Sequence, residues 1–251
     1  MKKHTAIVIG VGAEEGIGAA ICRRFASNGY DVLAAGRTLA KLSQVVKTIT
    51  FEGGSAESYV MDSTDQAQVL ALFDLGMSAT AEREPANVVV FNSASLNRTM
   101  DFRELSALTF EEVWRQNCFA GFLVGRESAR RLVPLGRGSV LFTGASGSLR
   151  GKPSFAQFAA AKSGLRMIAQ SMAREFGPQG IHVAHIVIDG GVAGDRLKGL
   201  LPDLEDRCGK DGLLNVDDIA QTYWMIHQQA RSVWTHELDL RPFKESFQRF
   251  A

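Results

Sequence analysis

The feature that most constrains this chain is an alternation of short strand-like runs with helix-length segments. Runs of consecutive apolar and β-branched residues predict strands that are buried on both faces. These strands are predicted at 5–9, 31–35, 58–61, 88–91, 140–143 and 181–188, with a last one at 234–240. Strands that alternate with helices in this way form βαβ units, so the sequence predicts a parallel sheet.

Segments with helical spacing of apolar residues occupy most of the intervals between these strands. Helices are expected at 19–28, 39–50, 66–81, 109–132, 155–176 and 215–229, and 195–214 is expected to be a polar loop with one helical turn. Such helices cover both faces of a parallel sheet. The prediction is therefore an α/β, Rossmann-type doubly wound fold with three layers, α/β/α. The length of 251 residues fits a single domain, residues 1–251.

Composition excludes several functional classes. The chain has 28 basic and 27 acidic residues, so no charge-driven nucleic-acid or membrane surface is expected. No apolar run reaches the length of about eighteen residues that a membrane helix needs, and no secretory signal is recognisable. Cysteines are few and lack metal-ligand spacing: Cys22, Cys118 and Cys208. His182 and His185 should face opposite sides of a strand, with His182 exposed and His185 half-buried, so they form no metal site. The expectation is a soluble, cytoplasmic protein without a metal.

A glycine-rich turn follows the first predicted strand. Gly12, Gly16 and Gly18 lie between that strand and the first predicted helix. Glycine permits a tight turn and lets the backbone approach a pyrophosphate at the helix N-terminus. The spacing differs from the common dinucleotide fingerprint, so a tight turn without a ligand is the alternative interpretation.

The end of the second strand bears on the choice of nucleotide. An acid that binds the ribose 2′-hydroxyl is expected about twenty residues after the turn, but Gly36 and Arg37 stand there. A guanidinium can pair with a 2′-phosphate, which favours NADP(H) over NAD(H), while a solvated loop charge is the plainer interpretation. Glu14 and Glu15 would oppose a phosphate if they faced it.

Several motifs, taken in order, resemble the short-chain dehydrogenase/reductase family along nearly the whole chain. They are Gly12-x-x-x-Gly16-Ile17-Gly18, Asp62, Asn92-Ser93-Ala94-Ser95, Trp114-x-x-Asn117, Lys162 and Gly180-Ile181-His182-Val183. Each is weak alone, but together, on the expected elements, they are specific for the fold. The resemblance implies an oxidoreductase with a small-molecule substrate. It also implies a homodimer or homotetramer paired through the helices near 109–132 and 155–176.

The resemblance also implies roles for individual residues. With Arg37 included, the expected NADP(H)-binding positions are Gly12, Gly16, Ile17, Gly18, Arg37, Asp62, Asn92, Lys162 and Val192. Asp62 would contact the adenine, and Val192 would contact the carboxamide through its backbone. Lys162 would hold the nicotinamide ribose, and Asn117 would anchor a water in the proton path.

Two catalytic positions depart from the family. The family uses a Tyr four residues before the Lys as general acid and a Ser about thirteen residues earlier, but here the residues are Phe158 and Ala145. A phenol beside an ammonium ion has a lowered pKa and can protonate an alkoxide, whereas phenylalanine has no proton to give. The alternative donors are Ser146, beside Ala145, and Asp189, at the end of the sixth strand. A turn serine and a loop or cap aspartate are their plainer interpretations.

The sequence leaves more than one function open. The first is an NADP(H)-dependent oxidoreductase with an atypical site that reduces a conjugated C=C or an unusual carbonyl, because some family reductases of conjugated bonds lack this Tyr. The second is a catalytically silent NADP(H)-binding protein with a sensing or assembly role. A third is another reaction on the same scaffold, such as a dehydration. Residues 195–214 are expected to form the substrate lid and indicate no substrate class.

Overall fold

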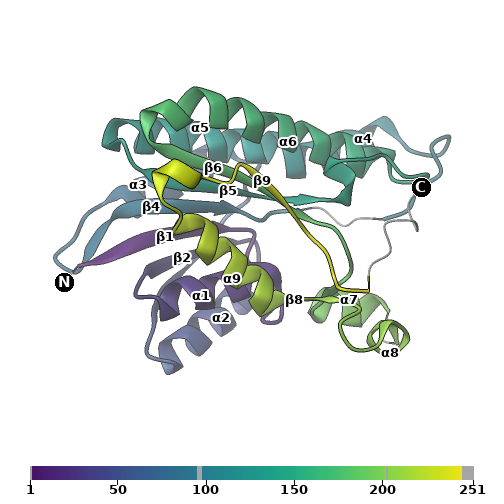
Figure 1. Ribbon diagram of the computed structural model, residues 1–251, viewed down its shortest axis with the longest axis horizontal. Coiled ribbons are helices and arrows are strands. Elements are labelled where there is room, and N and C mark those ends of the chain that lie inside the picture. The colour runs from purple at the N-terminus through teal and green to yellow at the C-terminus, as the bar shows by residue number, and fades with distance from the viewer. Residues whose placement is uncertain (1, 95–97, 202, 245–251) are drawn as a thin grey trace.

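One parallel sheet of seven strands organises the molecule (Figure 1). The computed structural model describes residues 2–94, 98–201 and 203–244, so Ser95 and Pro202 of the predicted segments lie outside the described residues. The strand order is β3-β2-β1-β4-β5-β6-β9, and each pair is parallel. The strands are β1 (Lys3–Ile9), β2 (Asp31–Gly36), β3 (Ser55–Val60), β4 (Arg83–Phe91), β5 (Gly138–Ala145), β6 (Ile181–Ile188) and β9 (Glu237–Leu240).

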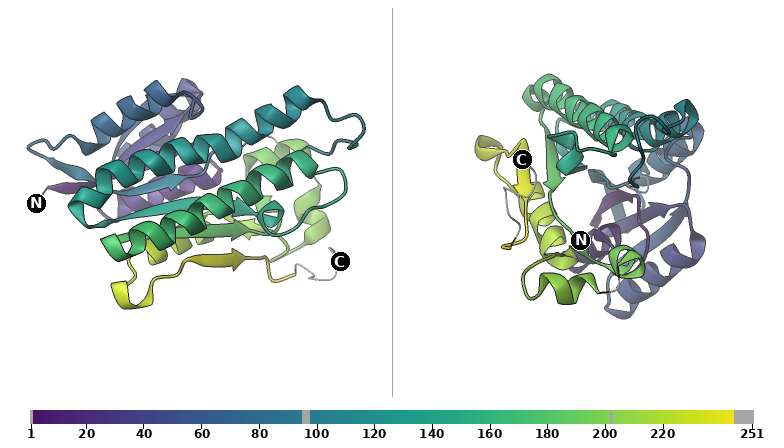
Figure 2. Two further views of the ribbon diagram at one scale, coloured as in Figure 1. Left: turned by 90° about the horizontal axis from the view of Figure 1, so that it is seen from above. Right: turned by 90° about the vertical axis from the view of Figure 1, so that its right-hand side faces the viewer.

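Helices cover both faces of this sheet, as Figure 2 shows in two further views. The longer helices are α1 (Ile17–Ser27), α2 (Leu39–Phe51), α3 (Gln66–Met77), α4 (Ala107–Trp114), α5 (Ala120–Leu132), α6 (Ala156–Phe176) and α9 (Val216–His227). Helices α1, α2 and α9 pack on one face, and α3, α5 and α6 pack on the other. The predicted three-layer, doubly wound α/β fold is therefore confirmed.

The alternation of side chains along each strand creates the two cores. In β1, Ala6 and Val8 join the core beneath α1, α2 and α9, whereas Ile7 and Ile9 join the core beneath α3, α5 and α6. Successive side chains of a strand point to opposite faces, so a strand buried on both faces must be apolar throughout. This is why continuous apolar runs indicated β1, β4, β5 and β6. The predicted strands 58–61 and 234–240 differ from β3 and β9, which begin at Ser55 and Glu237 and are only partly buried.

The segment predicted as one helix over 109–132 is continuous but not uniform. Between α4 and α5 it forms a π-helical turn, Arg115–Phe119. Such a turn inserts one extra residue per turn and often occurs at functional sites. Here it carries Asn117, whose side chain is buried.

The segment 195–214 differs from the prediction of a loop with a single helical turn. It contains two short helices, α7 (Asp195–Leu200) and α8 (Leu204–Cys208), and ends at β8 (Leu214–Asn215), which pairs with β7 (Val192–Ala193). The reason is apolar packing: leucines from separate parts of this segment meet over Gly191. They are Leu197, Leu204 and Leu213.

Candidate active site

The carboxyl ends of the strands bring the predicted site residues to one edge of the sheet. The glycine turn follows β1, Arg37 follows β2, Asp62 follows β3, Asn92 follows β4 and Ala145 ends β5. The strand order changes direction between β1 and β4. Open parallel sheets bind ligands at such a switch point, outside the carboxyl ends of the strands.

The glycine turn combines tight packing with an open surface. A Cβ at Gly10, whose φ is +93°, would lie 2.3 Å from Ser93 N, and one at Gly18 would lie 2.8 Å from Gly10 O. At Gly12, apart from its chain neighbours, no atom of the described residues lies within 4 Å of the Cβ position. Gly16 caps α1 without a side-chain hydrogen bond. Backbone N–H groups at an open helix N-terminus suit a pyrophosphate, so these residues fit a dinucleotide.

The two glutamates in this turn are paired with cations. Glu14 Oε1 lies 2.9 Å from Arg23 Nη1, and Glu15 Oε2 lies 2.9 Å from Lys198 Nζ. The backbone N–H of Glu15 also donates to Asp195 Oδ2 at 3.1 Å. These contacts lessen the repulsion that the sequence suggested, and they attach α7 to the glycine turn.

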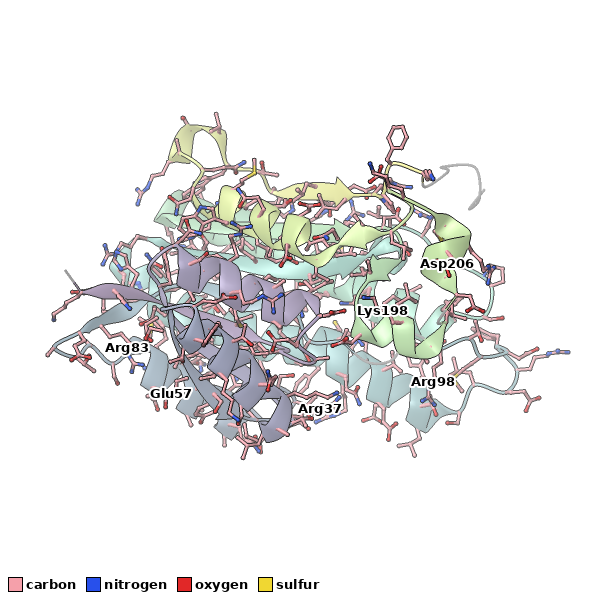
Figure 3. All side chains as sticks on the ribbon, turned by 90° about the horizontal axis from the view of Figure 1, so that it is seen from below. Arg37, Glu57, Arg83, Arg98, Lys198 and Asp206 are labelled. Carbon is pink, nitrogen blue, oxygen red and sulfur yellow. The ribbon has the colours of Figure 1, made fainter. Side chains whose placement is uncertain are left out.

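The packing at the end of β2 explains why position 36 carries no acidic side chain. A Cβ at Gly36 would lie 2.3 Å from Val11 O, so this position has no room for a side chain. Arg37, the next residue, is exposed, and Met61 N donates to Gly36 O at 2.9 Å, which brings the exposed Asp62 beside the end of β2. Figure 3 shows Arg37 with Arg98 and Lys198 toward this end of the molecule.

Asn92 is part of a hydrogen-bond chain beneath the turn. Its Nδ2 donates to Gly10 O at 3.1 Å, and its Oδ1 accepts from Thr143 Oγ1 at 3.0 Å. Thr143 Oγ1 also lies 2.7 Å from Tyr223 Oη of α9. Burial raises the pKa of Tyr223. Thr143 and Tyr223 could not be linked from the sequence, because no local pattern connects residues on elements so far apart in the chain.

Lys162 and Phe158 share one face of α6, as their spacing of four residues requires. Lys162 is only 2% exposed, and its Nζ donates to Thr143 O at 2.9 Å. The same Nζ lies 6.0 Å from the centre of the Phe158 ring. Phe158 is buried and packs against Gly147, where a Cβ would lie 3.0 Å from Phe158 Cδ1. The buried ammonium group therefore has an aromatic ring, and no hydroxyl, one helical turn away.

The hydroxyl groups near the end of β5 differ in their contacts. Ser148 is buried and its Oγ accepts from Ala145 N at 3.1 Å, while Ala145 and Ser146 are half-buried. Gln157 is buried and donates to Arg98 O at 2.9 Å, so it binds the segment before α4. Ser146, the sequence neighbour of Ala145, is thus more exposed than Ser148.

Asn117 and Val192 lie on elements that border the site. The Nδ2 of Asn117 donates to Val113 O at 2.8 Å, across the π-helical turn. Val192 begins β7 and is half-buried against the core beneath α9. Gly164 of α6 lies close to Cys118, where a Cβ would lie 2.7 Å from Sγ, so the π-helical turn packs directly on the helix that carries Lys162.

Asp189 lies at the end of β6 and is buried between two arginines. Arg150 Nη2 donates to both carboxylate oxygens, at 2.8 and 2.7 Å, and Arg241 Nη2 donates to Oδ2. Both oxygens are therefore engaged by guanidinium groups, which leaves Asp189 poorly placed to transfer a proton. No sequence pattern indicates this cluster, because Arg150 and Arg241 stand in segments without periodicity.

The two histidines of β6 are more buried than predicted. His182 is 2% exposed, because the Trp234 ring stacks on it at 4.9 Å and 2°, so the expectation that His182 is exposed was wrong. His185 is fully buried, and its Nδ1 lies 2.9 Å from Glu237 Oε2. Burial lowers the pKa of His185 to about 4. Arg166, bound to both Glu237 oxygens at 2.7 Å, lowers the pKa of Glu237.

Two further observations concern metals and membranes. In the part of the chain that the structure describes, no three His, Cys, Asp or Glu side chains are grouped as metal ligands. Among the same residues, no helix is both long and apolar enough to span a membrane.

A parallel sheet with a glycine turn at its switch point defines the class of Rossmann-type dinucleotide-binding folds. The family model described as short chain dehydrogenase matches residues 5–202, and the chain belongs to this family. It is 37% identical to a short-chain dehydrogenase from Rhodopseudomonas palustris of known structure, with a TM-score of 0.81 over 97% of this chain and 100% of that one.

Two more distant proteins extend this comparison. Gluconate 5-dehydrogenase of Gluconobacter oxydans is 28% identical over 173 residues, which span 68% of this chain and 66% of that protein, slightly less than two thirds. A metagenomic short-chain oxidoreductase, solved in complex with NADP, has a TM-score of 0.79 at 22% identity and covers 97% of this chain and 99% of its own.

Proposed function

We propose that this chain is an NADP(H)-binding oxidoreductase with an atypical active site, which reduces a C=C bond conjugated to a carbonyl or an unusual carbonyl. The observation that supports it most is the buried Lys162 ammonium beside the Phe158 ring. Ala145, at the position where the family has a serine, also lacks a hydroxyl. A cation is retained where the family holds the nicotinamide ribose, but two proton-carrying groups are absent from the sequence positions that usually supply them.

The cofactor assignment is supported by residues at the carboxyl ends of the strands. Gly12 leaves open space above the start of α1, where Gly16, Ile17 and Gly18 would follow the pyrophosphate. Arg37 and Asp62 are exposed at the neighbouring ends of β2 and β3. A related fold solved with NADP is consistent with this choice. In this proposal Asn92 supports the turn from below, and Val192 borders the nicotinamide end.

The proposed substrate class follows from which side chains of the site can donate a proton. Bound NADPH supplies a hydride. Reduction of a simple ketone also needs a proton on the forming alkoxide, and loss of a positioned acid costs roughly 10²–10⁴-fold in rate. Loss of one oxyanion donor costs about 10²–10³-fold more. Phe158 and Ala145 supply neither group, so an ordinary ketone is a poor substrate for this site.

Reduction of a C=C bond conjugated to a carbonyl depends less on proton donors at positions 145 and 158. Addition of a hydride to its β-carbon pushes the C=C electron pair toward the carbonyl and gives an enolate, and water then protonates the α-carbon. The Lys162 ammonium stabilises negative charge in the buried site, and the half-buried Ser146 hydroxyl is the donor available to the enolate oxygen. Asn117 would hold a water in the proton path.

A catalytically silent NADP(H)-binding protein is the second proposal. It is favoured by the engagement of Asp189 with Arg150 and Arg241, because this carboxylate was the remaining acidic candidate for a substitute proton donor. In this proposal the residues around the glycine turn bind the nucleotide as a signal, and the chain acts through assembly with other molecules.

Turnover separates the two proposals. The purified chain is mixed with NADPH and with aldehydes, ketones, enones and enoyl thioesters, and NADPH oxidation is followed by absorbance. We expect oxidation with the conjugated acceptors, abolished in Lys162→Met and retained in Lys47→Met, an exposed lysine of α2. NADPH binding without oxidation of any acceptor would support the silent protein. Conversion of a substrate without NADPH would indicate a dehydration or a related reaction.

We also propose the assembly and the lid that the family resemblance implies. Large apolar side chains are exposed along α4, α5 and α6, among them Leu108 at 67%, Phe122 at 41% and Met167 at 50%, and these favour a homodimer or homotetramer. Light scattering of the purified chain tests this. Residues 195–214 would cover the substrate, since α7 already contacts the glycine turn. The free thiols of Cys22, Cys118 and Cys208 fit a cytoplasmic location.

A further inference from the structure

The segment that carries α7 is attached to one residue of the glycine turn, Glu15. The N–H of Glu15 donates to Asp195 Oδ2 at 3.1 Å, and the N–H of Asp195 donates to Glu15 O at 3.3 Å. The Lys198 ammonium, labelled in Figure 3, lies 2.9 Å from Glu15 Oε2. Glu15 therefore meets α7 with its backbone N–H, its carbonyl and its carboxylate.

The two backbones approach so closely that position 194 must be glycine. A Cβ at Gly194 would lie 2.3 Å from Glu15 O, which belongs to the backbone and cannot turn aside as the end of a flexible side chain can. Glu15 and Asp195 are 180 positions apart in the sequence. The contact between the turn and α7 thus depends on particular residues in two distant parts of the chain.

The other glutamate of the turn does not depend on α7 for its cation. Glu14 Oε1 lies 2.9 Å from Arg23 Nη1, and the same Nη1 donates to Glu14 O at 2.8 Å. Arg23 belongs to α1, the helix that begins directly after this turn, so its charge stays at the turn wherever α7 lies. Lys198, in contrast, lies beside the turn only while α7 is attached.

The attachment leaves the start of α1 available to a nucleotide. The contacts with α7 are made by Glu15, whereas the pyrophosphate is expected at the helix N-terminus that begins with Gly16 and Ile17. There the Lys198 ammonium attracts a polyanion, and a Glu15 carboxylate without its cation repels it. Asp195 also carries a negative charge, which the Glu15 N–H partly offsets. A nucleotide and an attached α7 therefore favour each other.

We propose that Glu15 is a positioning residue that couples nucleotide binding to the attachment of α7, an inference that rests on the proposed NADP(H)-binding function. Glu15 holds α7, and α7 holds the Lys198 ammonium beside the nucleotide, which strengthens nucleotide binding. By linkage, the bound nucleotide strengthens the attachment of α7 by the same factor. The nucleotide thus helps to hold the segment 195–214 over the site.

Amide hydrogen exchange of α7 measures the attachment, with and without saturating NADPH. In the parent chain NADPH should slow the exchange of the α7 amides roughly two- to fivefold, the range expected for an exposed ion pair. This slowing should be lost in Lys198→Gln and in Glu15→Gln. It should persist in Lys47→Gln, an exposed lysine of α2 that controls for net charge. Faster exchange of α7 with NADPH, or equal slowing in Glu15→Gln, would overturn the proposal.

The affinity for NADPH, measured by fluorescence titration at low salt, tests the reverse direction. Lys198→Gln should weaken binding roughly two- to fivefold in the parent chain. It should have little effect in a chain that already carries Glu15→Gln, because the lysine is then no longer held at the turn. The loss should also shrink at about 1 M salt, which screens exposed charges. An equal loss with and without Glu15→Gln would mean that Lys198 binds phosphate independently of Glu15, and the proposal would fail.

These outcomes separate the coupling from the proposed function. A parent chain that binds no NADPH would contradict the cofactor assignment and the coupling with it, whereas NADPH binding that Lys198→Gln leaves unchanged would contradict the coupling alone. Gly194→Ala tests the close contact without any nucleotide, and it should speed the exchange of the α7 amides. Thermal melting shows whether this variant remains folded; if it does not, Glu15→Gln and Lys198→Gln decide.

Discussion

At the scale of single residues, Phe158 is the side chain on which the proposed chemistry depends most. Its ring lies one helical turn before Lys162 and packs on Gly147, so an apolar surface adjoins the buried ammonium group. The sequence alone indicates that the two side chains share one face of α6, because a spacing of four residues on a helix places them on the same side. It could not predict that Lys162 donates to Thr143 O, since that contact depends on how α6 packs against β5.

The first prediction restores the two missing hydroxyl groups. The double variant Phe158→Tyr with Ala145→Ser should raise NADPH-dependent reduction of simple ketones by roughly 10²–10⁴-fold, because a phenol beside Lys162 regains a proton to donate. Absorbance of NADPH measures the rate, and each single variant serves as a control. A double variant that binds NADPH but remains inert on every ketone would mean that position 145 or 158 is wrongly assigned.

The second prediction concerns Arg37. Replacement by Asp should weaken NADPH binding roughly 10–100-fold, because the guanidinium loses its charge-assisted bonds to the 2′-phosphate and a repulsive carboxylate takes its place. NADH binding should change much less. Fluorescence titration of both nucleotides measures the two affinities, with Arg174→Asp as a control for net charge. An equal loss for NADPH and NADH would show that Arg37 does not recognise the 2′-phosphate.

At the scale of elements, Asp189 joins three segments that meet only in the folded state. It follows the last residue of β6, Arg150 precedes α6, and Arg241 follows β9. A carboxylate so deeply buried is tolerated only because both oxygens are paired. The predicted element boundaries located Asp189 at a strand end, but the two arginines could be found only from the packing of loops.

The third prediction follows from this burial. Asp189→Ala should lower the free energy of unfolding by about 3–5 kcal/mol, because it leaves two guanidinium groups partly buried without their carboxylate. Chemical denaturation measures the loss. Asp239→Ala removes a carboxylate that also pairs with Arg241 but is 35% exposed, so its cost should stay below about 1 kcal/mol. Similar losses for both variants would contradict the role given to burial.

At the scale of the whole molecule, the sequence predicted the sheet and both helical layers, because the central strands are continuous apolar runs and the helices between them have apolar residues at helical spacing. It did not predict the two helices of 195–214, whose leucines are not periodic and pack only around Gly191. It also missed the burial of His182, because Trp234, whose ring stacks on that histidine, stands 52 positions later in the sequence. Contacts across such distances leave no local pattern.

The fourth prediction is an acid-sensitive fold. His185 is buried and neutral, with a pKa lowered from 6.5 to about 4, so between these values the unfolded chain binds a proton that the folded chain does not. Stability therefore falls as pH decreases from 6.5 to 4, by roughly 3 kcal/mol for this histidine. The lowered pKa of Glu237 adds a further loss at still lower pH. Urea unfolding at pH 7 and 4.5 measures the change, and His185→Gln should make the dependence shallower. An unchanged slope in that variant would refute the assignment.

Strand β9 has a consequence for how the chain is made. It supplies Glu237 to His185 and Arg166, which precede it by 52 and 71 positions, and the residue after it, Arg241, pairs with Asp189. The ribosome synthesises the chain from its N-terminus. One edge of β6 therefore stays unpaired until β9 and Arg241 have left the ribosome. The nascent chain then carries unshielded histidine, arginine and aspartate beside an open edge, the condition under which strands of different molecules associate. A chaperone that shelters this edge would matter most in the interval between the synthesis of β6 and that of β9.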